Sequence, residues 1–411
     1  MKFLGHWVMK WSVWGTSLLA GSIAWSEDFV WSPSSPGVDM IRMTNPGPVV
    51  CAAVRMELAR FNADLVLTTT LASNTVVGLE PLTQQIRALP QSLGTAVAAI
   101  NGDFFLVNGP AKGDPRGLHI WNGELVSVAT GPAAFWQDAE GKFRIGKVSS
   151  RLQVVWPDGA TNLAGLNEPL GTNELVLFTP RLGVLNPEVP RTNARAATRA
   201  SETGPRAPQP MRPPGGREWT LEPVGAGPWL PLRVGQTYQA RLGGSRDGFT
   251  KVPPGNMLMS LGPKLVAKRS DLTSGSLITI QVVTEPDLSG VQTALGTGPM
   301  LVHQGRRYET VALSSQQPHP RSALGWNDHY FYLAVADGRQ KGFSEGFRLV
   351  EMADFLMALG CQEAINMDGG LSTLLLLNGT PVNHPSMTRG RPIANGIVVL
   401  RRPSDPHQAS N

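Results

Sequence analysis

The spacing of hydrophobic and polar residues predicts two helix–strand units that lie far apart in the chain. Residues 81–89 have the pattern of a short helix, and the apolar strand 96–100 comes soon after it. Residues 347–359 predict a longer helix, because apolar side chains recur three and four positions apart along one face. This helix leads into a second short apolar strand at residues 363–365.

The two units also share a motif and an order of elements. The first strand runs into Asn101-Gly102-Asp103 and the second into Asn366-Met367-Asp368, each directly after Ala-Ile. Each unit continues to a predicted hairpin with an Asn-Gly turn, at Asn122-Gly123 in one and at Asn378-Gly379 in the other. We therefore expect an internal helix–strand–hairpin repeat whose two copies pair within one domain.

Further strands complete the predicted fold. Residues 36–72 have a β-like pattern, and the apolar strand 329–336 ends in Asp337-Gly338-Arg339. Together the elements predict an α+β fold, a mixed sheet flanked by helices, in which the repeat forms one catalytic domain. Because adjacent strand ends of a sheet lie close together, Asp103, Asp337 and Asp368 are expected to share one cleft.

The first 26 residues have the features of a secretion signal. Lys2 and Lys10 precede or flank a short apolar stretch, and Ala24-Trp25-Ser26 offers small residues for cleavage. A membrane anchor is the alternative, but serines and glycines interrupt the stretch and shorten its apolar run. We expect a secreted or periplasmic protein with no membrane span after signal cleavage.

Residues 186–217 differ in composition from the rest of the chain. They contain seven prolines and six arginines but few large apolar residues, so they predict a flexible insertion. We divide the chain into a signal peptide at 1–26, an N-terminal β-rich region at 27–96, a catalytic domain at 97–400 that contains the insertion, and a disordered tail at 401–411.

The positive charge is concentrated in these same segments. The net charge of +5 falls to +3 without the two lysines of the first 26 residues, and residues 186–217 alone carry +4. The remainder is therefore close to neutral, which argues against a nucleic acid partner.

Cys51 and Cys361 are the only cysteines. In an exported chain they can form one disulfide bond, and both also fit the pattern of free thiols in an apolar core. No histidine lies near either of them in the sequence, which disfavours a catalytic cysteine.

Asp103, Asp337 and Asp368 are candidate catalytic residues. Each one neighbours a glycine, so the simpler interpretation is a turn in which the side chain bonds local backbone. As a set in one cleft, however, carboxylates raise one another's pKa and can separate the roles of acid, base and nucleophile.

Several neighbouring residues have the chemistry to bind an anion. Gly369 and Gly370 let the backbone approach a ligand with its N–H groups, and Ser372 adds a hydroxyl group. Arg321 and Arg339 suit a phosphate, although an arginine near carboxylates can also be a structural counter-charge.

The histidines lack the tight spacing of a metal site, so we expect no protein-bound zinc. An all-oxygen site on the three aspartates, for a divalent cation such as calcium or magnesium, is the alternative. No other cofactor is expected.

Six motifs, in this order, resemble the phosphodiester glycosidase family, which includes the enzyme that uncovers mannose 6-phosphate on lysosomal hydrolases. They are Ala98-Ala-Ile-Asn-Gly-Asp-Phe-Phe105, Gly298-Pro-Met-Leu-Val302, His319-Pro-Arg-Ser-Ala-Leu-Gly325, Val335-Ala-Asp-Gly-Arg-Gln340, Ser344-Glu-Gly346 and Ala364-Ile-Asn-Met-Asp-Gly-Gly-Leu-Ser-Thr373. Leu371 stands where the family pattern suggests a third glycine, which is conservative only if that backbone does not need a positive φ.

The resemblance implies cleavage of the bond between a sugar's anomeric carbon and a phosphodiester oxygen, in a phosphoglycan or a nucleotide sugar. It implies catalytic roles for the three aspartates and substrate binding by Asn101, Arg321, Arg339, Ser344, Gly369, Gly370 and Ser372. An ordinary glycoside hydrolase on an exopolysaccharide and a non-catalytic cell-wall glycan-binding protein are the competing hypotheses.

Overall fold

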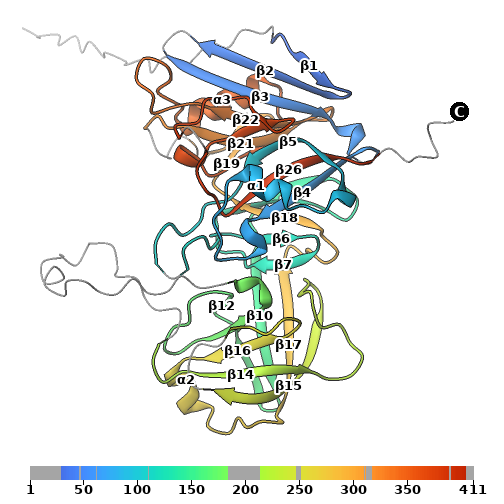
Figure 1. Ribbon diagram of the computed structural model, residues 1–411, viewed down its shortest axis with the longest axis vertical. Coiled ribbons are helices and arrows are strands. Elements are labelled where there is room, and N and C mark those ends of the chain that lie inside the picture. The colour runs from blue at the N-terminus through green and yellow to red at the C-terminus, as the bar shows by residue number, and fades with distance from the viewer. Residues whose placement is uncertain are drawn as a thin grey trace, which may run out of the picture.

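The computed structural model describes residues 29–403 except for 46–47, 62, 110, 184–212, 247–250, 310, 312–316 and 388–389. The described chain forms two lobes, one above the other in Figure 1, which are joined through the region of β6, β7 and β18. The expected signal peptide and nearly all of the expected insertion lie outside the described residues.

The strands form four sheets. One sheet contains, in spatial order, β1 (Ser32–Ser35), β2 (Val38–Asn45), β3 (Val49–Glu57), β22 (Tyr330–Ala336), β21 (Arg321–Trp326), β23 (Glu363–Asn366), β19 (Met300–His303) and β20 (Arg306–Arg307). A second contains β25 (Thr380–Pro381), β24 (Leu375–Leu377), β5 (Thr95–Asn101), β26 (Asn395–Arg401) and β4 (Leu65–Leu71). We call these the β22 sheet and the β5 sheet.

The other two sheets occupy the middle and the lower lobe of Figure 1. The middle sheet contains β7 (Glu124–Ser127), β6 (His119–Trp121), β18 (Thr293–Thr297), β8 (Ala133–Gln137) and β9 (Phe143–Gly146). The lower sheet contains β11 (Gly159–Asn162), β10 (Ser149–Trp156), β17 (Leu277–Glu285), β15 (Thr237–Arg246), β14 (Arg217–Pro223), β16 (Met257–Leu261), β13 (Leu175–Phe178) and β12 (Gly165–Leu166).

The β22 and β5 sheets, together with part of the middle sheet, enclose one apolar core. Alternate residues of each strand face it, as Ala52 and Val54 do from β3 and Ile397 and Val399 do from β26. Aromatic rings fill its centre, where Phe143 lies 4.6 Å from Phe331 between ring centroids. This packing holds the ends of two sheets in register, and the candidate site lies at those ends.

Two short helices cover the outer faces of this pair of sheets. α3 (Leu349–Ala358) places Met352, Phe355 and Leu356 against the β22 sheet, and α1 (Leu82–Arg87) packs Leu82 onto the β5 sheet. The third α-helix of the described residues, α2 (Pro263–Lys268), belongs to the lower lobe. The remaining helical turns are 3-10 turns of three residues, including η1 (Leu58–Arg60), η2 (Ala72–Asn74), η3 (Gln91–Leu93), η4 (Pro180–Leu182) and η7 (Gly370–Ser372).

The predicted α+β class is wrong. The protein is mostly β: 45% of it is strand and 12% helix, in several largely antiparallel sheets in place of one mixed sheet. Among the described strand pairs, only β12 with β13 is parallel. The helices that the sequence indicated do exist, but they are short covers on a framework of strands.

The helices, strands and hairpins of the predicted repeat are present, and the two copies pair through one hairpin strand. Both Asn-Gly pairs form tight hairpin turns in which both residues have positive φ. However, β5 and β23 belong to different sheets and are not hydrogen-bonded neighbours. The two copies pair instead through the second hairpin, because its strand β24 is antiparallel to β5 of the first copy.

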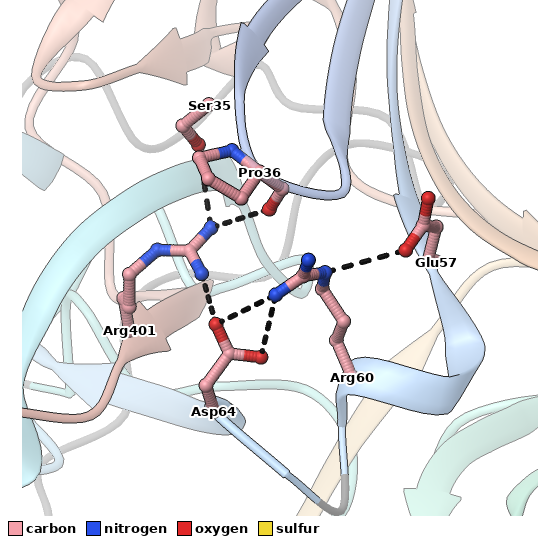
Figure 2. Close-up of polar contacts among 6 residues, drawn as sticks. All are labelled: Ser35, Pro36, Glu57, Arg60, Asp64 and Arg401. Carbon is pink, nitrogen blue, oxygen red and sulfur yellow. Dashed lines mark hydrogen bonds and ion pairs between the residues drawn. The ribbon is translucent and has the colours of Figure 1, made fainter. Parts of the chain in front are cut away.

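The strands of the N-terminal region share sheets with strands from the end of the chain: β3 pairs with β22, and β4 with β26. Two positions expected in unstructured segments also lie in strands, since Arg217 begins β14 and Arg401 ends β26. Figure 2 shows how Arg401 is held. Its guanidinium bonds Asp64 and the carbonyl oxygen of Pro36, while Arg60 bonds the same Asp64 carboxylate from the other side.

Both cysteines are free and buried, and they lie in the same apolar cluster on the α3 side of the β22 sheet. The sequence left open a disulfide bond or free thiols in the core, and the structure contains the free thiols. No helix among the described residues is long and apolar enough to cross a membrane.

Candidate active site

The ends of β5 and β23 are joined by one buried amide. Asn101 is fully buried, and its side-chain Nδ2 donates to the carbonyl oxygen of Asp368 at 2.6 Å. Its Oδ1 accepts hydrogen bonds from Ser322 Oγ at 2.7 Å and from the backbone N–H of Leu374 at 3.1 Å. The backbone N–H of Asp368 also donates to Gly102 O at 3.0 Å. These bonds bring the residues that follow each strand, Asp103 and Asp368, together.

Asp103 is 4% exposed and has one unpaired oxygen. Its Oδ1 accepts the backbone N–H of Phe104 at 2.7 Å, whereas Oδ2 has no hydrogen-bond partner in the part of the chain that the structure describes. Two glycines leave room for this oxygen. A Cβ on Gly296 would lie 2.5 Å from Oδ2, and one on Gly117 would lie 2.8 Å away. Any larger residue at either position would displace the carboxylate.

The pKa values of both aspartates are raised. Burial raises the pKa of Asp103 to about 7 and the Asp368 carboxylate adds to the rise, while the backbone N–H groups of Phe104 and Gly117 and the charge of Arg116 oppose it. Burial also raises the pKa of Asp368, against hydrogen bonds from Ser372 and Gly369 and the positive charges of Arg391 and Arg116. Of the pair, Asp368 has more groups that favour its ionised form, and Asp103 is the one that holds a proton near neutral pH.

The backbone N–H groups of Gly369 and Gly370, which the sequence suggested for anion binding, bond within the protein instead. Gly369 N–H donates to Asp368 Oδ1 at 2.9 Å, and Gly370 N–H donates to Pro320 O at 2.8 Å. Neither N–H is therefore free to bind an external anion. Gly370 has a φ of +62°, whereas Leu371 is not among the positive-φ residues, so a third glycine is not needed there.

Arg321 and Arg339 lie close together beside Gly370. A Cβ on Gly370 would be 3.2 Å from Arg339 Nη1, so the absence of a side chain lets the guanidinium approach this turn. Burial, and then the positive charge of Arg339, lower the pKa of Arg321 to about 10. Arg321 Nε donates to Phe347 O at 2.9 Å, and Arg339 Nη2 lies 3.4 Å from His319 Nδ1. Within the described ranges neither arginine has a carboxylate partner.

Two further arginines of the site were not identified from the sequence. Arg391 donates to Ser372 Oγ at 3.2 Å and stacks over the ring of Phe105 at 4.9 Å from the centroid. Arg116 lies in the loop between β5 and β6, and its positive charge lowers the pKa of both aspartates. Both lie in loops without a motif of their own, so the sequence alone does not place them at the site.

Asp337 does not join the pair of Asp103 and Asp368. Its carboxylate accepts the Asn383 amide at 2.8 Å and the backbone N–H of His384 at 2.9 Å, which fixes the loop that follows β25. Burial raises the pKa of Asp337, and these hydrogen bonds oppose the rise. Ser344 is likewise fully buried, donating to Asp337 O at 2.6 Å and accepting from Val50 N at 3.0 Å. Of the three aspartates expected to lie together, Asp103 and Asp368 do so and Asp337 lies apart.

A cleft of about 690 Å³ opens beside Asp103, between the loop after β5, the loop after β7, the β18–β19 turn and residues of the lower lobe. Neither Arg321 nor Arg339 lines it. No group of three or more histidine, cysteine, aspartate or glutamate side chains suited to hold a metal ion occurs among the described residues.

One known family resembles part of the chain. Residues 236–400 match the family model of the phosphodiester glycosidases, and this segment includes Arg321, Arg339 and Asp368. None of the curated proteins is similar enough in sequence to be matched to the chain.

Solved structures share the fold. A protein from Synechocystis aligns with a TM-score of 0.66 at 19% identity, over 90% of this chain and 63% of the other, so the chain spans less than two thirds of that protein. A protein from Burkholderia pseudomallei K96243, described as exported, aligns with a TM-score of 0.61 at 19% identity, over 87% of this chain and 74% of the other.

A third structure is the zebrafish N-acetylglucosamine-1-phosphodiester alpha-N-acetylglucosaminidase catalytic domain, auto-inhibited by its pro-peptide. It aligns over 90% of this chain and 86% of the other, at 13% identity and a TM-score of 0.43, which is too distant to support a statement about the fold. The family match itself supports a hydrolase of the glycosidase type. It also agrees with the resemblance seen in the motifs: residues 236–400 of this chain match the model of the phosphodiester glycosidase family.

Proposed function

We propose that the protein is an exported hydrolase that cleaves the glycosyl–phosphate bond of a sugar-1-phosphodiester and releases the sugar. The observation that carries this proposal is the pairing of two carboxyl groups, Asp103 and Asp368, beside arginines that lack carboxylate partners among the described residues. The carboxyl pair suits reaction at an anomeric carbon, and the arginines suit a phosphate.

The arginines are the phosphate site of the proposal. Burial, and then the positive charge of Arg339, lower the pKa of Arg321, and the charge of Glu351 opposes this without forming an ion pair with Arg321. A phosphodiester bound between the two arginines removes the repulsion between their charges. As the glycosyl bond breaks, negative charge grows on the phosphate, so the same two groups stabilise the transition state more than the ground state.

The aspartates divide the remaining roles. The bond between the anomeric carbon and the phosphate oxygen breaks, and its electron pair leaves with the phosphate. The ionised Asp368 stabilises the positive charge that develops on the sugar, and a water oxygen forms the new bond to the anomeric carbon. Asp103, with its pKa near neutral pH and an unpaired oxygen, takes the proton of that water.

Phosphoglycans and nucleotide sugars both contain the required bond, and an exported enzyme would meet the former at the cell envelope. Export rests on the signal-like first 26 residues of the sequence.

Turnover of a panel of substrates by the wild-type protein and Asp368→Asn tests this function. We expect free sugar to be released from sugar-1-phosphodiesters and not from aryl glycosides, and we expect Asp368→Asn to lower kcat at least 100-fold while the protein stays folded. Asp328→Asn is the matched control, because Asp328 is exposed in the turn between β21 and β22. Hydrolysis of aryl glycosides alone would indicate an ordinary glycoside hydrolase. Glycan binding without turnover would indicate a binding protein.

A further inference from the structure

The cleft beside Asp103 has a charge opposite to that of the arginine group. Its charged lining residues are Asp103, Asp114, Glu168 and Glu174 with Arg116 as the one cation among the described lining residues. Apolar surface completes it, from Phe104, Leu106 and four prolines. A pocket of this volume lies in the usual range of roughly 300–1,000 Å³ for small-molecule sites, and its charge disfavours an anion.

Asp114 is the most unusual residue of this lining. It is 2% exposed, and its Oδ1 receives no hydrogen bond from any donor within the described part of the chain. Burial raises the pKa of Asp114, and the neighbouring Glu168 carboxyl group adds to the rise through its charge and through a hydrogen bond between the two side chains, which leaves Oδ1 of Asp114 as the oxygen without a partner. A buried carboxyl oxygen without a donor is costly unless a ligand supplies one.

Glu168 approaches from the lower lobe and is held in place by its neighbours. The preceding residue, Asn167, has a φ of +60° and donates from Nδ2 to Val126 O at 3.3 Å and to Thr179 Oγ1 at 3.1 Å. Gly165 makes room for the glutamate, since a Cβ there would lie 2.5 Å from Glu168 Cβ. The side chain is therefore positioned before any ligand arrives.

The chemistry of this cleft identifies the kind of ligand. Unsatisfied carboxyl oxygens require O–H or N–H donors, and a sugar ring carries several hydroxyl groups together with apolar C–H faces that pack on aromatic and proline surfaces. The carboxyl groups do not form a metal-binding cluster among the described residues, which disfavours a cation. A neutral sugar fits all of these observations.

We infer that Asp114 and Glu168 form the sugar-binding part of the site, which holds the hydroxyl groups of a neutral sugar in the cleft while the arginines hold the phosphate. This inference rests on the proposed function for the identity of the sugar as the released group. It adds Asp114 and Glu168, from two different lobes, as residues that determine specificity. The substrate then lies with its anomeric carbon near Asp103, which lines the cleft and neighbours Asp368.

Binding of separate halves of the substrate to the full-length mature protein tests the inference. The probes are free glucose and N-acetylglucosamine as neutral sugars, glucosamine as a cationic one, calcium chloride, and inorganic phosphate, each titrated by calorimetry or NMR. We expect Asp114→Asn combined with Glu168→Gln to weaken binding of at least one neutral sugar tenfold or more and to leave phosphate binding unchanged. Arg339→Met should have the reverse effect, and Asp138→Asn, a surface carboxylate of the β8–β9 turn, should change neither.

The amide variants keep the shape of protonated carboxyl groups, so we expect them to fold. Gly165→Ala is a second route, because the added methyl group displaces Glu168 without changing a charge, and it should weaken the same sugar. Unchanged sugar affinity in both variants, binding of glucosamine or calcium alone, or no sugar binding to the wild-type protein would each overturn the inference. Sugar binding needs no turnover, so an absence of diester hydrolysis would count against the proposed function and not against this site.

Discussion

Asp103 is a titratable group in a space that two glycines leave open, and its burial predicts a specific pH dependence. Its pKa of about 7 means that the native state binds a proton between about pH 4 and 7 that the unfolded chain has already released. The bound proton stabilises the native state fully below about pH 4, and this stabilisation is lost as the pH rises to 7. As a proton acceptor, Asp103 should also make kcat/KM rise with pH through about 7.

Asp103→Asn separates these two effects. The variant should lose activity, yet be more stable than the wild type at pH 8 by about 1 to 4 kcal/mol, because it removes a buried ionised group. Thermal or urea unfolding at pH 5 and pH 8 measures the stability, and kcat/KM between pH 5 and 9 measures the activity. A wild-type rate that is flat across pH 7, or equal losses of stability at both pH values, would contradict the assigned role.

For single residues, the sequence predicted which residue types belong to the site better than it predicted what each residue does there. Asp103 lies near Asp368, and Arg321 lies near Arg339, and all four residues belong to the quoted motifs. Asn101 and Ser344, however, are completely occupied by hydrogen bonds within the protein. A polar residue at a strand end has the same sequence pattern whether it contacts a ligand or a neighbouring strand, so the pattern cannot separate the two.

At the scale of elements, the junction between β5 and β23 depends on the Asn101 amide. Asn101→Ala would leave buried polar groups of Asp368, Ser322 and Leu374 without partners, which costs about 1–3 kcal/mol for each unsatisfied group. We expect the variant to unfold at lower urea concentration and to lose activity through displacement of Asp368.

Ser322→Ala is the control for this change, because it removes only one of the three hydrogen bonds. It should cost less stability than Asn101→Ala and retain most of the activity. Urea unfolding and kcat measure both. If the two variants are equally stable and equally active, the junction does not position Asp368.

Helices and hairpins were predictable because their signals are local. The helical spacing of residues 347–359 and the two Asn-Gly turns act over a few positions and appear in the structure as α3 and two tight turns. Sheet membership is not local. The pairings of β3 with β22 and β4 with β26 join residues several hundred positions apart, and alternation of apolar residues does not specify which strand becomes the neighbour.

At the scale of the whole molecule, the site draws on distant parts of the chain. Glu168 reaches the cleft from the lower lobe, while Asp103 and Asp114 come from the loop after β5. No motif marks Glu168 in the sequence, because its position depends on how the lobes pack. The residues inferred to bind the sugar could therefore not be predicted from the sequence, whereas the arginines proposed to bind phosphate lie within recognisable motifs.

The two ends of the described chain are also tied together away from the site. Asp64 bonds Arg60 and Arg401, and Arg401 reaches Pro36 O at 2.7 Å, so one carboxylate links the first hairpin, the η1 turn and the last strand (Figure 2). The groups are partly exposed, so the network should contribute only about 1 kcal/mol and weaken in salt.

Asp64→Asn tests whether this network matters for the molecule as a whole. We expect a loss of about 1 kcal/mol in the free energy of unfolding at low ionic strength, a smaller loss in 1 M salt, and unchanged kcat/KM, because Asp64 lies at the opposite end of β4 and β26 from the catalytic pair. Asp138→Asn is the comparison variant: it breaks a local ion pair with Arg144 within the β8–β9 hairpin, so it should not change kcat/KM either. A fall in kcat/KM would show instead that the chain ends are coupled to the ends of β5 and β26 where Asp103 is held, through Asn395, whose Oδ1 accepts the Asp103 N–H at 2.8 Å.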